Sequence, residues 1–206
     1  MNGFNWLGGQ LRIERGSKAD YTELERFHYL GGAPAVWAGV WVVRFRTEDS
    51  GLRTEREKRA PSLGTDLSVL SPQSSALSPS RVIAVGVLSF PTARCKVREK
   101  RLGIELNGRY GHMKWLNENL RTISRVIVHP QFRAIGMASR LVRRMCEESP
   151  TRYVESIAAM GRVHPFFEKA GMEKIECGEK GYFLWDRGEV QNSERGMQNE
   201  IQLPHS

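Results

Sequence analysis

A short glycine-containing loop between two regular segments holds residue types that could do chemistry. The β-branched run Val126–Val128 stops at His129-Pro130, and an amphipathic stretch begins directly behind Gly136. The first amide N–H groups of a helix have no partner inside it and carry the positive end of its dipole, so they attract phosphate groups. Gly136 has no side chain to keep a ligand away, and Arg133 adds a permanent charge. The loop suits a nucleotide-type ligand with a diphosphate, although the spacing also fits a purely structural turn.

A second candidate is an acid inside an apolar run, Glu155 within Tyr153–Ala159. A carboxylate in such a strand must be paired, solvated in a cleft, or raised in pKa, and this suits a general base. The alternative is a solvent-facing position on an ordinary strand. We predict that Glu155 acts as the base.

The elements that must position these residues are readable from periodicity and turn signals. The predicted strands are Leu11–Glu14, Val36–Phe45, Arg81–Phe90, Thr122–Val128, Tyr153–Ala159 and Tyr182–Trp185. The predicted helical segments are Ala19–Tyr29, Leu116–Leu120, Met137–Cys146 and His164–Ala170. Residues 94–111 fit a loop or an irregular hairpin. The mixture predicts an α+β or α/β fold, with helices on both faces of a sheet.

The chain length of 206 residues suits one domain, which we place at residues 1–186. Residues 47–80 are rich in Ser, Pro, Glu and Arg and have little periodicity. Such a segment buries too little apolar surface to offset its ordering entropy, so we predict a flexible insertion. Residues 187–206 are polar and are predicted to be a disordered tail.

Positive charge is concentrated in residues 94–144, which hold 13 Lys and Arg against three Asp and Glu, a local excess of +10 against +8 for the chain. This pattern suits nucleic acid or a phosphate-rich small molecule, or else a merely solvated face. The longest apolar stretch, Ala35–Val43, is too short to cross a bilayer, so no membrane association is expected. The cysteines Cys95, Cys146 and Cys177 lack metal-ligand spacing. They indicate reduced thiols and a cytoplasmic protein.

Two ordered motifs carry a family resemblance. Residues 133–138, Arg-Ala-Ile-Gly-Met-Ala, resemble the R/Q-x-x-G-x-G/A motif of the GNAT superfamily, the acyl-CoA-dependent N-acyltransferases. Residues 165–172, Pro-Phe-Phe-Glu-Lys-Ala-Gly-Met, resemble the "FYEKxGF" segment that packs beside the acyl-CoA in that family. The resemblance implies a mixed, mostly antiparallel sheet that splays at its centre.

The resemblance also implies a donor site for a coenzyme A thioester, acetyl-CoA above all. The pantetheine arm would pair with the strand at 126–128, and the loop at 133–138 would hold the pyrophosphate. The residues so assigned are Val126, Ile127, Val128, Arg133, Ala134, Ile135, Gly136, Met137, Ala138 and Phe167. The acceptor amine stays unidentified, because acceptor pockets in this fold are built from variable loops.

The family chemistry is direct attack of a neutral amine on the thioester, which needs a base and a proton donor for the leaving thiolate. The donor is commonly a tyrosine at the position of Phe167, which cannot donate. We therefore name four further candidates beside Glu155. They are His28 and Tyr29 at the end of the first helix, His164 before the short helix, and Tyr182 on the last strand.

Two other functions stay open. The His28-Tyr29 pair resembles one found in the viral Mom-type proteins, which modify adenine in DNA on the same fold. An acidic residue on the strand before the last helix is also expected in those proteins, and Glu155 corresponds to it with a different spacing to the following helix. The basic segment would suit a DNA backbone, because cationic side chains release condensed counterions. Alternatively, the fold is a non-catalytic module that docks nucleic acid, although such a module would not need the loop at 133–138.

Overall fold

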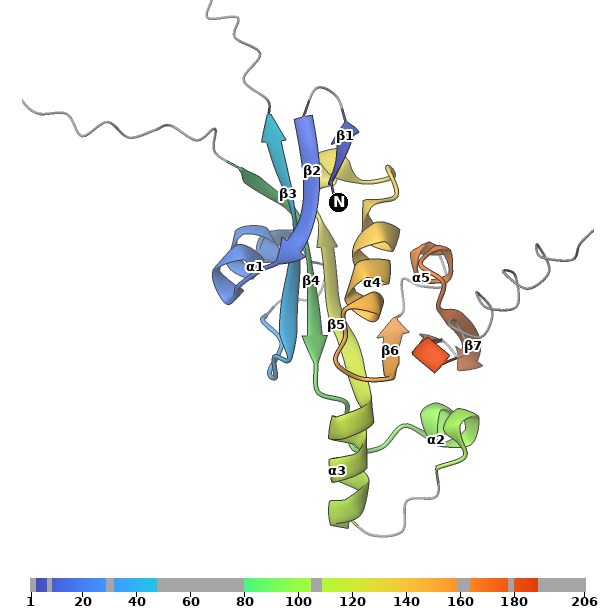
Figure 1. The fold of residues 1–206 in the computed structure, drawn as a ribbon. Coiled ribbons are helices and arrows are strands. Elements are labelled where there is room, and N and C mark those ends of the chain that lie inside the picture. The colour runs from blue at the N-terminus through green and yellow to red at the C-terminus, as the bar shows by residue number, and fades with distance from the viewer. Residues whose placement is uncertain are drawn as a thin grey trace, which may run out of the picture.

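One mixed sheet runs through the protein, with its strands in the order β1-β2-β3-β4-β5-β6-β8-β7 (Figure 1). The computed structural model describes residues 3–6, 9–28, 32–47, 80–104, 109–158, 164–177 and 180–188. The strands are β1 (Gly3–Trp6), β2 (Gly9–Arg15), β3 (Gly39–Thr47), β4 (Arg81–Ser89), β5 (Leu120–Val128), β6 (Tyr153–Ala158), β7 (Glu173–Cys177) and β8 (Lys180–Asp186). Neighbouring strands pair antiparallel, except that β5 and β6 run parallel.

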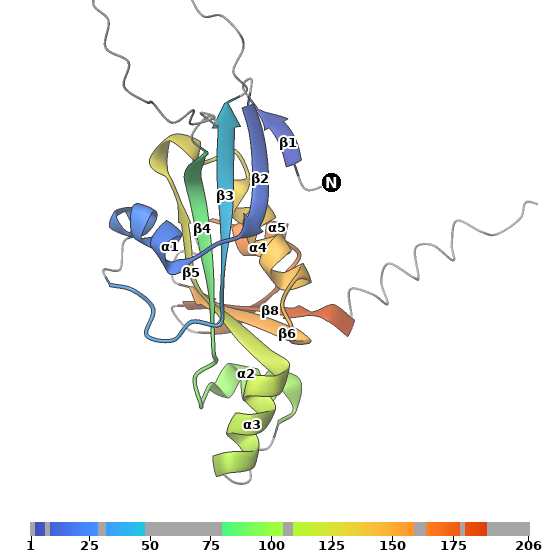
Figure 2. The ribbon, with the colours of Figure 1, turned by 60° about the vertical axis from the view of Figure 1, so that its left-hand side comes forward.

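Helices cover both faces of the sheet, as Figures 1 and 2 show for α1 and α4. Helix α1 (Lys18–Leu24), continued by the 3-10 turn η1 (Glu25–Phe27), packs on β3 and β4. Helix α4 (Met137–Glu147) packs on β3, β4 and β5 from the opposite side. The predicted α+β class with two covered faces is confirmed.

Strand β4 lies at the centre of both packing layers, because its residues from Val82 to Ser89 are all buried. One apolar cluster joins the sheet to α4 through residues such as Leu141 and Met145, and a second joins it to α1 through Tyr21 and Leu24. A near-continuous apolar run is typical of a strand covered on both sides.

Helix α4 comes close to the sheet over Gly86. A Cβ atom at Gly86 would collide with Sδ of Met145 and lie 3.4 Å from Cδ2 of Leu141. The strand–loop–helix segment predicted from residue 126 onward therefore seats its helix on a strand that lacks a side chain at the contact.

Two helices correct the interpretation of residues 94–111. They hold α2 (Lys96–Leu102) and the start of α3 (Arg109–Asn119), which extends well beyond the short turn predicted at 116–120. The Glu99 carboxylate accepts a hydrogen bond from the Cys95 amide, and Gly103 ends α2 in the left-handed conformation. The sequence pattern missed α2 because the residue it buries is Arg98, so no apolar stripe marks the helix.

The remaining differences concern bounds and short strands. Strand β3 begins at Gly39 rather than Val36, the helix predicted at His164–Ala170 is reduced to α5 (Phe166–Lys169), and β1 and β7 were not predicted. A second 3-10 turn among the described residues, η3 (Pro130–Phe132), follows β5. The predicted insertion at 47–80 and tail at 187–206 lie almost wholly outside the described residues, so the domain bounds stay predictions.

Candidate active site

The sheet splays between its two parallel strands. Strands β5 and β6 pair only where Leu120, Arg121 and Thr122 face Tyr153, Val154 and Glu155. Beyond these pairs β6 crosses away from β5, as Figure 2 shows, while β5 stays paired with β4 as far as Val128. The divergence opens a gap in the middle of the sheet at the place that the resemblance implied.

A cavity of about 870 Å³ lies at this splay. Its volume falls within the roughly 300–1,000 Å³ typical of small-molecule sites. The lining residues come from six segments of the chain, 26–28, 123–128, 133–139 without 135, 156–158, 164–167 and 169. They reach it from η1 on one face of the sheet and from α4 and α5 on the other.

The loop before α4 has the geometry of an anion cradle. Ala134 and Gly136 both adopt the left-handed conformation, with φ of 65° and 79°, and Gly136 is the N-terminal cap of α4. A Cβ atom at Gly136 would meet nothing within 4 Å, so the space beside the N-terminal cap of the helix is open to a ligand. The positive end of the helix dipole and the free backbone N–H donors at this helix end fit the pyrophosphate of coenzyme A.

Arg133 borders the cradle with its side chain exposed. Its Nε donates to the Val128 carbonyl at 3.2 Å, and its Nη2 lies 3.5 Å from the Phe27 carbonyl. The cavity at the cradle thus spans from the end of β5 to η1.

Most of the predicted coenzyme residues line the cavity. They are Val126, Ile127, Val128, Arg133, Ala134, Gly136, Met137, Ala138 and Phe167. Ile135 is exposed and is not among the lining residues. This agreement concerns position only, and the coenzyme roles stay predictions.

Phe167 forms an apolar wall of the cavity. Its ring stacks on Phe183 at a centroid distance of 4.7 Å and lies 4.2 Å from Phe166, and it is only 2% exposed. A side chain in this setting shields and orients a bound group but exchanges no proton.

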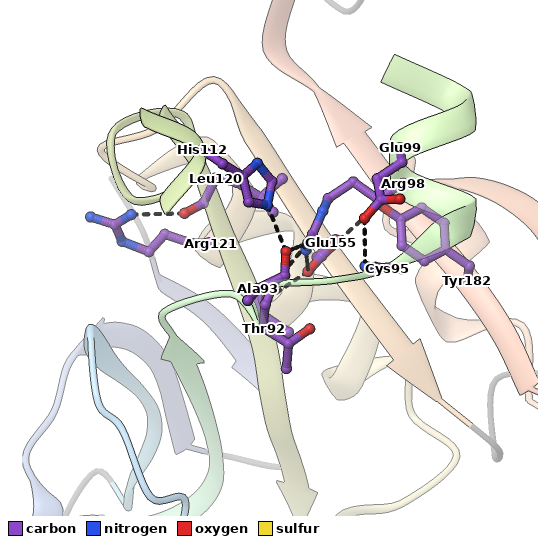
Figure 3. Close-up of polar contacts among 11 residues, drawn as sticks. Thr92, Ala93, Cys95, Arg98, Glu99, His112, Leu120, Arg121, Glu155 and Tyr182 are labelled. Atoms are coloured by element: carbon purple, nitrogen blue, oxygen red, sulfur yellow. Dashed lines mark hydrogen bonds and ion pairs between the residues drawn. The ribbon is translucent and has the colours of Figure 1, made fainter. Parts of the chain in front are cut away.

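Glu155 does not line the cavity but lies in a buried ion pair (Figure 3). Its Oε1 accepts hydrogen bonds from Arg98 Nη1 at 2.9 Å and from Thr122 Oγ1 at 2.8 Å, and its Oε2 accepts one from the Tyr182 hydroxyl at 2.8 Å. The side chains of Glu155 and Arg98 are 0% and 1% exposed. Of the three settings expected for Glu155, the structure shows the paired one, because Arg98 neutralises the charge away from the cavity. This position does not support the predicted role of Glu155 as the base.

Tyr182 does not line the cavity either. Burial raises the pKa of its phenol far above the usual range, and the neighbouring Glu155 carboxylate raises this pKa further. Its proton is committed to Glu155, so Tyr182 is unsuited to protonate a leaving thiolate.

The two histidines are the predicted acid–base residues that the fold brings to the cavity. His28 lines it half-buried from the end of η1, and His164 lines it exposed from the start of the α5 turn. Tyr29 lies outside the described residues. Within the described lining, these imidazoles are the side chains best able to accept a proton near neutral pH.

The structure adds cavity residues that the sequence did not single out for binding. Arg26, Ser139, Ser156 and Lys169 belong to the described lining. Lys169 lies within the motif segment 165–172 and Ser139 directly follows the loop at 133–138. No local motif marks Arg26 and Ser156, because they come from separate elements that meet only at the splay. The basic segment at 94–144 does not form one face, since Arg98 is buried while Arg125 and Arg133 reach the cavity.

In the part of the chain that the structure describes, no helix is long and apolar enough to cross a membrane.

Comparison with known proteins identifies the fold. No protein-family model matches the sequence, and no curated protein sequence is similar to it. The structure of Arabidopsis thaliana NAA60 in complex with acetyl-CoA is similar, with a TM-score of 0.51 and 13% identity over 85% of this chain and 99% of that chain. The predicted GNAT-like fold is thereby confirmed.

Two further structures are similar at lower scores. AtaTR bound with acetyl-CoA has a TM-score of 0.45 and 13% identity over 88% of this chain and 96% of that chain. An agmatine N-acetyltransferase has a TM-score of 0.43 and 9% identity over 85% of this chain and 99% of that chain.

Proposed function

We propose that this protein is an acyl-CoA-dependent N-acyltransferase, with acetyl-CoA as the donor. The observation that carries the proposal is the cavity at the β5–β6 splay, which ends at an open helix N-terminus. The similarity to a structure that holds acetyl-CoA supports the choice of donor.

Different residues of the chain would bind the coenzyme, transfer the proton and exclude water. The amides that follow Gly136, with Arg133, hold the pyrophosphate, and the strand at 126–128 orients the arm of the coenzyme. When bound, the thioester supplies an acyl carbon to which the acceptor nitrogen forms a C–N bond while the C–S bond breaks and sulfur leaves as a thiolate. His28 or His164 takes the proton that the attacking amine loses, and the protonated histidine then gives this proton to the thiolate, which becomes the thiol. Phe167 excludes water from one wall.

Modification of adenine in DNA is less well supported. That hypothesis assigns an acidic residue to Glu155, which is sealed beneath Arg98, and Tyr29 of its His-Tyr pair lies outside the described residues. A non-catalytic binding module would leave the open cradle without a purpose.

The test of the donor site is Gly136→Glu, examined by calorimetric titration of acetyl-CoA. The substitution puts a carboxylate where the pyrophosphate must lie, so we expect the affinity to fall at least about 100-fold. Gly103→Glu is the matched control, because Gly103 is also left-handed, with φ of 62°, and also has open space around it, but lies outside the cavity. Equal affinity in the two variants would refute the donor site.

The base is tested by His28→Gln and His164→Gln. The variant that removes the base should lower kcat about 100-fold and flatten the acidic limb of its pH profile, while acetyl-CoA binding stays unchanged. Full activity in both variants would exclude histidine as the base.

A further inference from the structure

The cavity passes through the sheet and has a second side that the coenzyme motifs do not explain. Val126 packs with the apolar cluster beneath α4, where the cradle lies, whereas Ile127 packs with the cluster beneath α1. Phe27 and His28 close the cavity on the α1 face. Because the cradle occupies the α4 face, the opposite side is available to the acceptor.

Positive charge surrounds this cavity without any balancing acid. The described lining residues include Arg26, Arg125, Arg133 and Lys169 but no Asp or Glu. Within the described residues, Arg26, Arg125 and Arg133 form no ion pair with an Asp or Glu carboxylate. Many arginines elsewhere do form such pairs, among them Arg15, Arg44, Arg98, Arg101, Arg143, Arg144 and Arg152.

Arg26 and Arg125 belong to the acceptor side. The Arg26 guanidinium is exposed and lies 4.8 Å from the centroid of the Phe27 ring. Arg125 Nη1 donates to the Ser124 carbonyl at 2.8 Å, and its Nη2 lies 3.5 Å from the Gly32 carbonyl, which follows η1 in the chain. Neither guanidinium is paired with a carboxylate in the described residues, so an anionic ligand in the cavity would balance the charges of Arg26 and Arg125.

We propose that the acceptor amine is carried by an anion, whose phosphate or carboxylate group is bound by Arg26 and Arg125. The proposal rests on the proposed function and names its substrate class. A guanidinium presents planar donors that match both oxyanions. The same charges repel amines that carry a further positive charge, such as diamines.

The cationic lining also explains how the amine is activated without a carboxylate base. Nearby positive charges favour the neutral form of an amine, which is the nucleophile. The attacking nitrogen then passes its proton to a cavity histidine while the C–S bond breaks, and the histidine gives the proton to the leaving thiolate. The arginines thus act on recognition and on protonation together.

The test compares amines of matched size and different charge. With acetyl-CoA as the donor, the acceptor probes are three amines that differ only in the group at the end away from the reacting amine. They are phosphoethanolamine, ethanolamine and ethylenediamine. We expect kcat/KM to fall at least about tenfold at each step from anion to neutral molecule to cation. The acetylated products are measured by mass spectrometry, because the partly exposed thiol of Cys95 would disturb a thiol assay.

Two further probes distinguish the sources of the anion. β-Alanine supplies a carboxylate, and a single-stranded oligonucleotide supplies backbone phosphates beside base amines. Preference for either over ethanolamine supports the proposal and identifies the source. Equal or better turnover of ethanolamine or ethylenediamine overturns it.

Two variants test whether Arg26 and Arg125 bind the anionic group of the acceptor. Arg26→Gln and Arg125→Gln should each raise the KM for the preferred anion about tenfold, and leave the acetyl-CoA dissociation constant within about twofold. Arg143→Gln is the control, because Arg143 is exposed on α4 and paired with Glu147. If the first two variants weaken acetyl-CoA binding instead, the arginines serve the donor and the proposal is wrong.

The measurements distinguish failure of the proposed function from failure of the anionic-acceptor proposal. Absence of acetyl-CoA binding refutes the proposed function. Acetyl-CoA binding without turnover of any probe, and without binding of any anionic probe to the loaded protein by calorimetry, overturns the anionic acceptor alone.

Discussion

His129, directly after β5, shows how a single residue couples the stability of the fold to pH. Arg81 Nη2 lies 2.8 Å from its Nε2, and since arginine only donates, this nitrogen must be unprotonated. Phe27 and Phe132 pack edge-on against the imidazole ring at 4.8 and 5.9 Å. Burial lowers the pKa of His129, and the charges of Arg81, Arg26 and Arg133 lower this pKa further.

Stability should therefore fall in mild acid. Below about pH 6.5 the unfolded chain binds a proton at His129 that the folded chain resists, so the free energy of unfolding decreases as the pH falls. The slope from this one group is at most about 1.4 kcal/mol per pH unit. Urea unfolding between pH 7.5 and pH 5.5 measures it.

The control is His129→Gln, which should flatten this part of the pH dependence, whereas His164→Gln at an exposed position should not. An unchanged slope in His129→Gln would mean that the imidazole is protonated in the folded protein too.

At the scale of elements, α2 is attached to the sheet by a charge. Arg98 is the buried residue of this helix, and it reaches Glu155 on β6 while its Nη2 donates to the Thr92 carbonyl at 2.7 Å. A buried ion pair replaces the apolar stripe that usually anchors a helix. Through this ion pair Glu155 connects β6 to α2.

Arg98→Ala should lower the free energy of unfolding by about 3–5 kcal/mol, because it leaves the Glu155 charge buried without a counterion. Arg101→Ala, on the same helix, removes a half-exposed pair with Glu173 and should cost less than about 1 kcal/mol. Chemical denaturation of both variants is the measurement.

The double variant Arg98→Met with Glu155→Leu should recover much of the loss, because no charge is then buried. Equal costs for Arg98→Ala and Arg101→Ala would contradict this account of α2.

At the scale of the whole molecule, the cavity lies where the sheet is weakest. The block β1–β5 meets the block β6–β8 through three residue pairs of one parallel ladder. A ligand that fills the splay contacts both blocks, since 123–128 and 156–158 both line the cavity. Binding should therefore stabilise the protein as a unit.

Acetyl-CoA at about 100 times its dissociation constant should add about 2.7 kcal/mol to the free energy of unfolding. For a chain of this size that corresponds to a rise in Tm of roughly 5–10 °C. Thermal unfolding followed by circular dichroism measures the shift, and Gly136→Glu should abolish it. A shift of the same size in Gly136→Glu would place the ligand away from the cradle.

The local part of the candidate site was predictable from sequence. A β-branched run, a turn with glycine and an amphipathic stretch lie within 126–147, and each depends on neighbours a few residues away. For this reason β5, the loop around Gly136 and α4 are close to their predicted positions. The resemblance of the motifs to the GNAT superfamily extended this local pattern to the fold.

Only the tertiary structure decided the chemistry of the charged residues. Glu155 and Arg98 are 57 positions apart, so the sequence could not show that they neutralise each other away from the cavity. The same holds for Arg26 and Arg125, which approach one cavity from different elements. Backbone periodicity is set by nearest neighbours along the chain. The charge and burial of a side chain are set by residues that meet it only after folding.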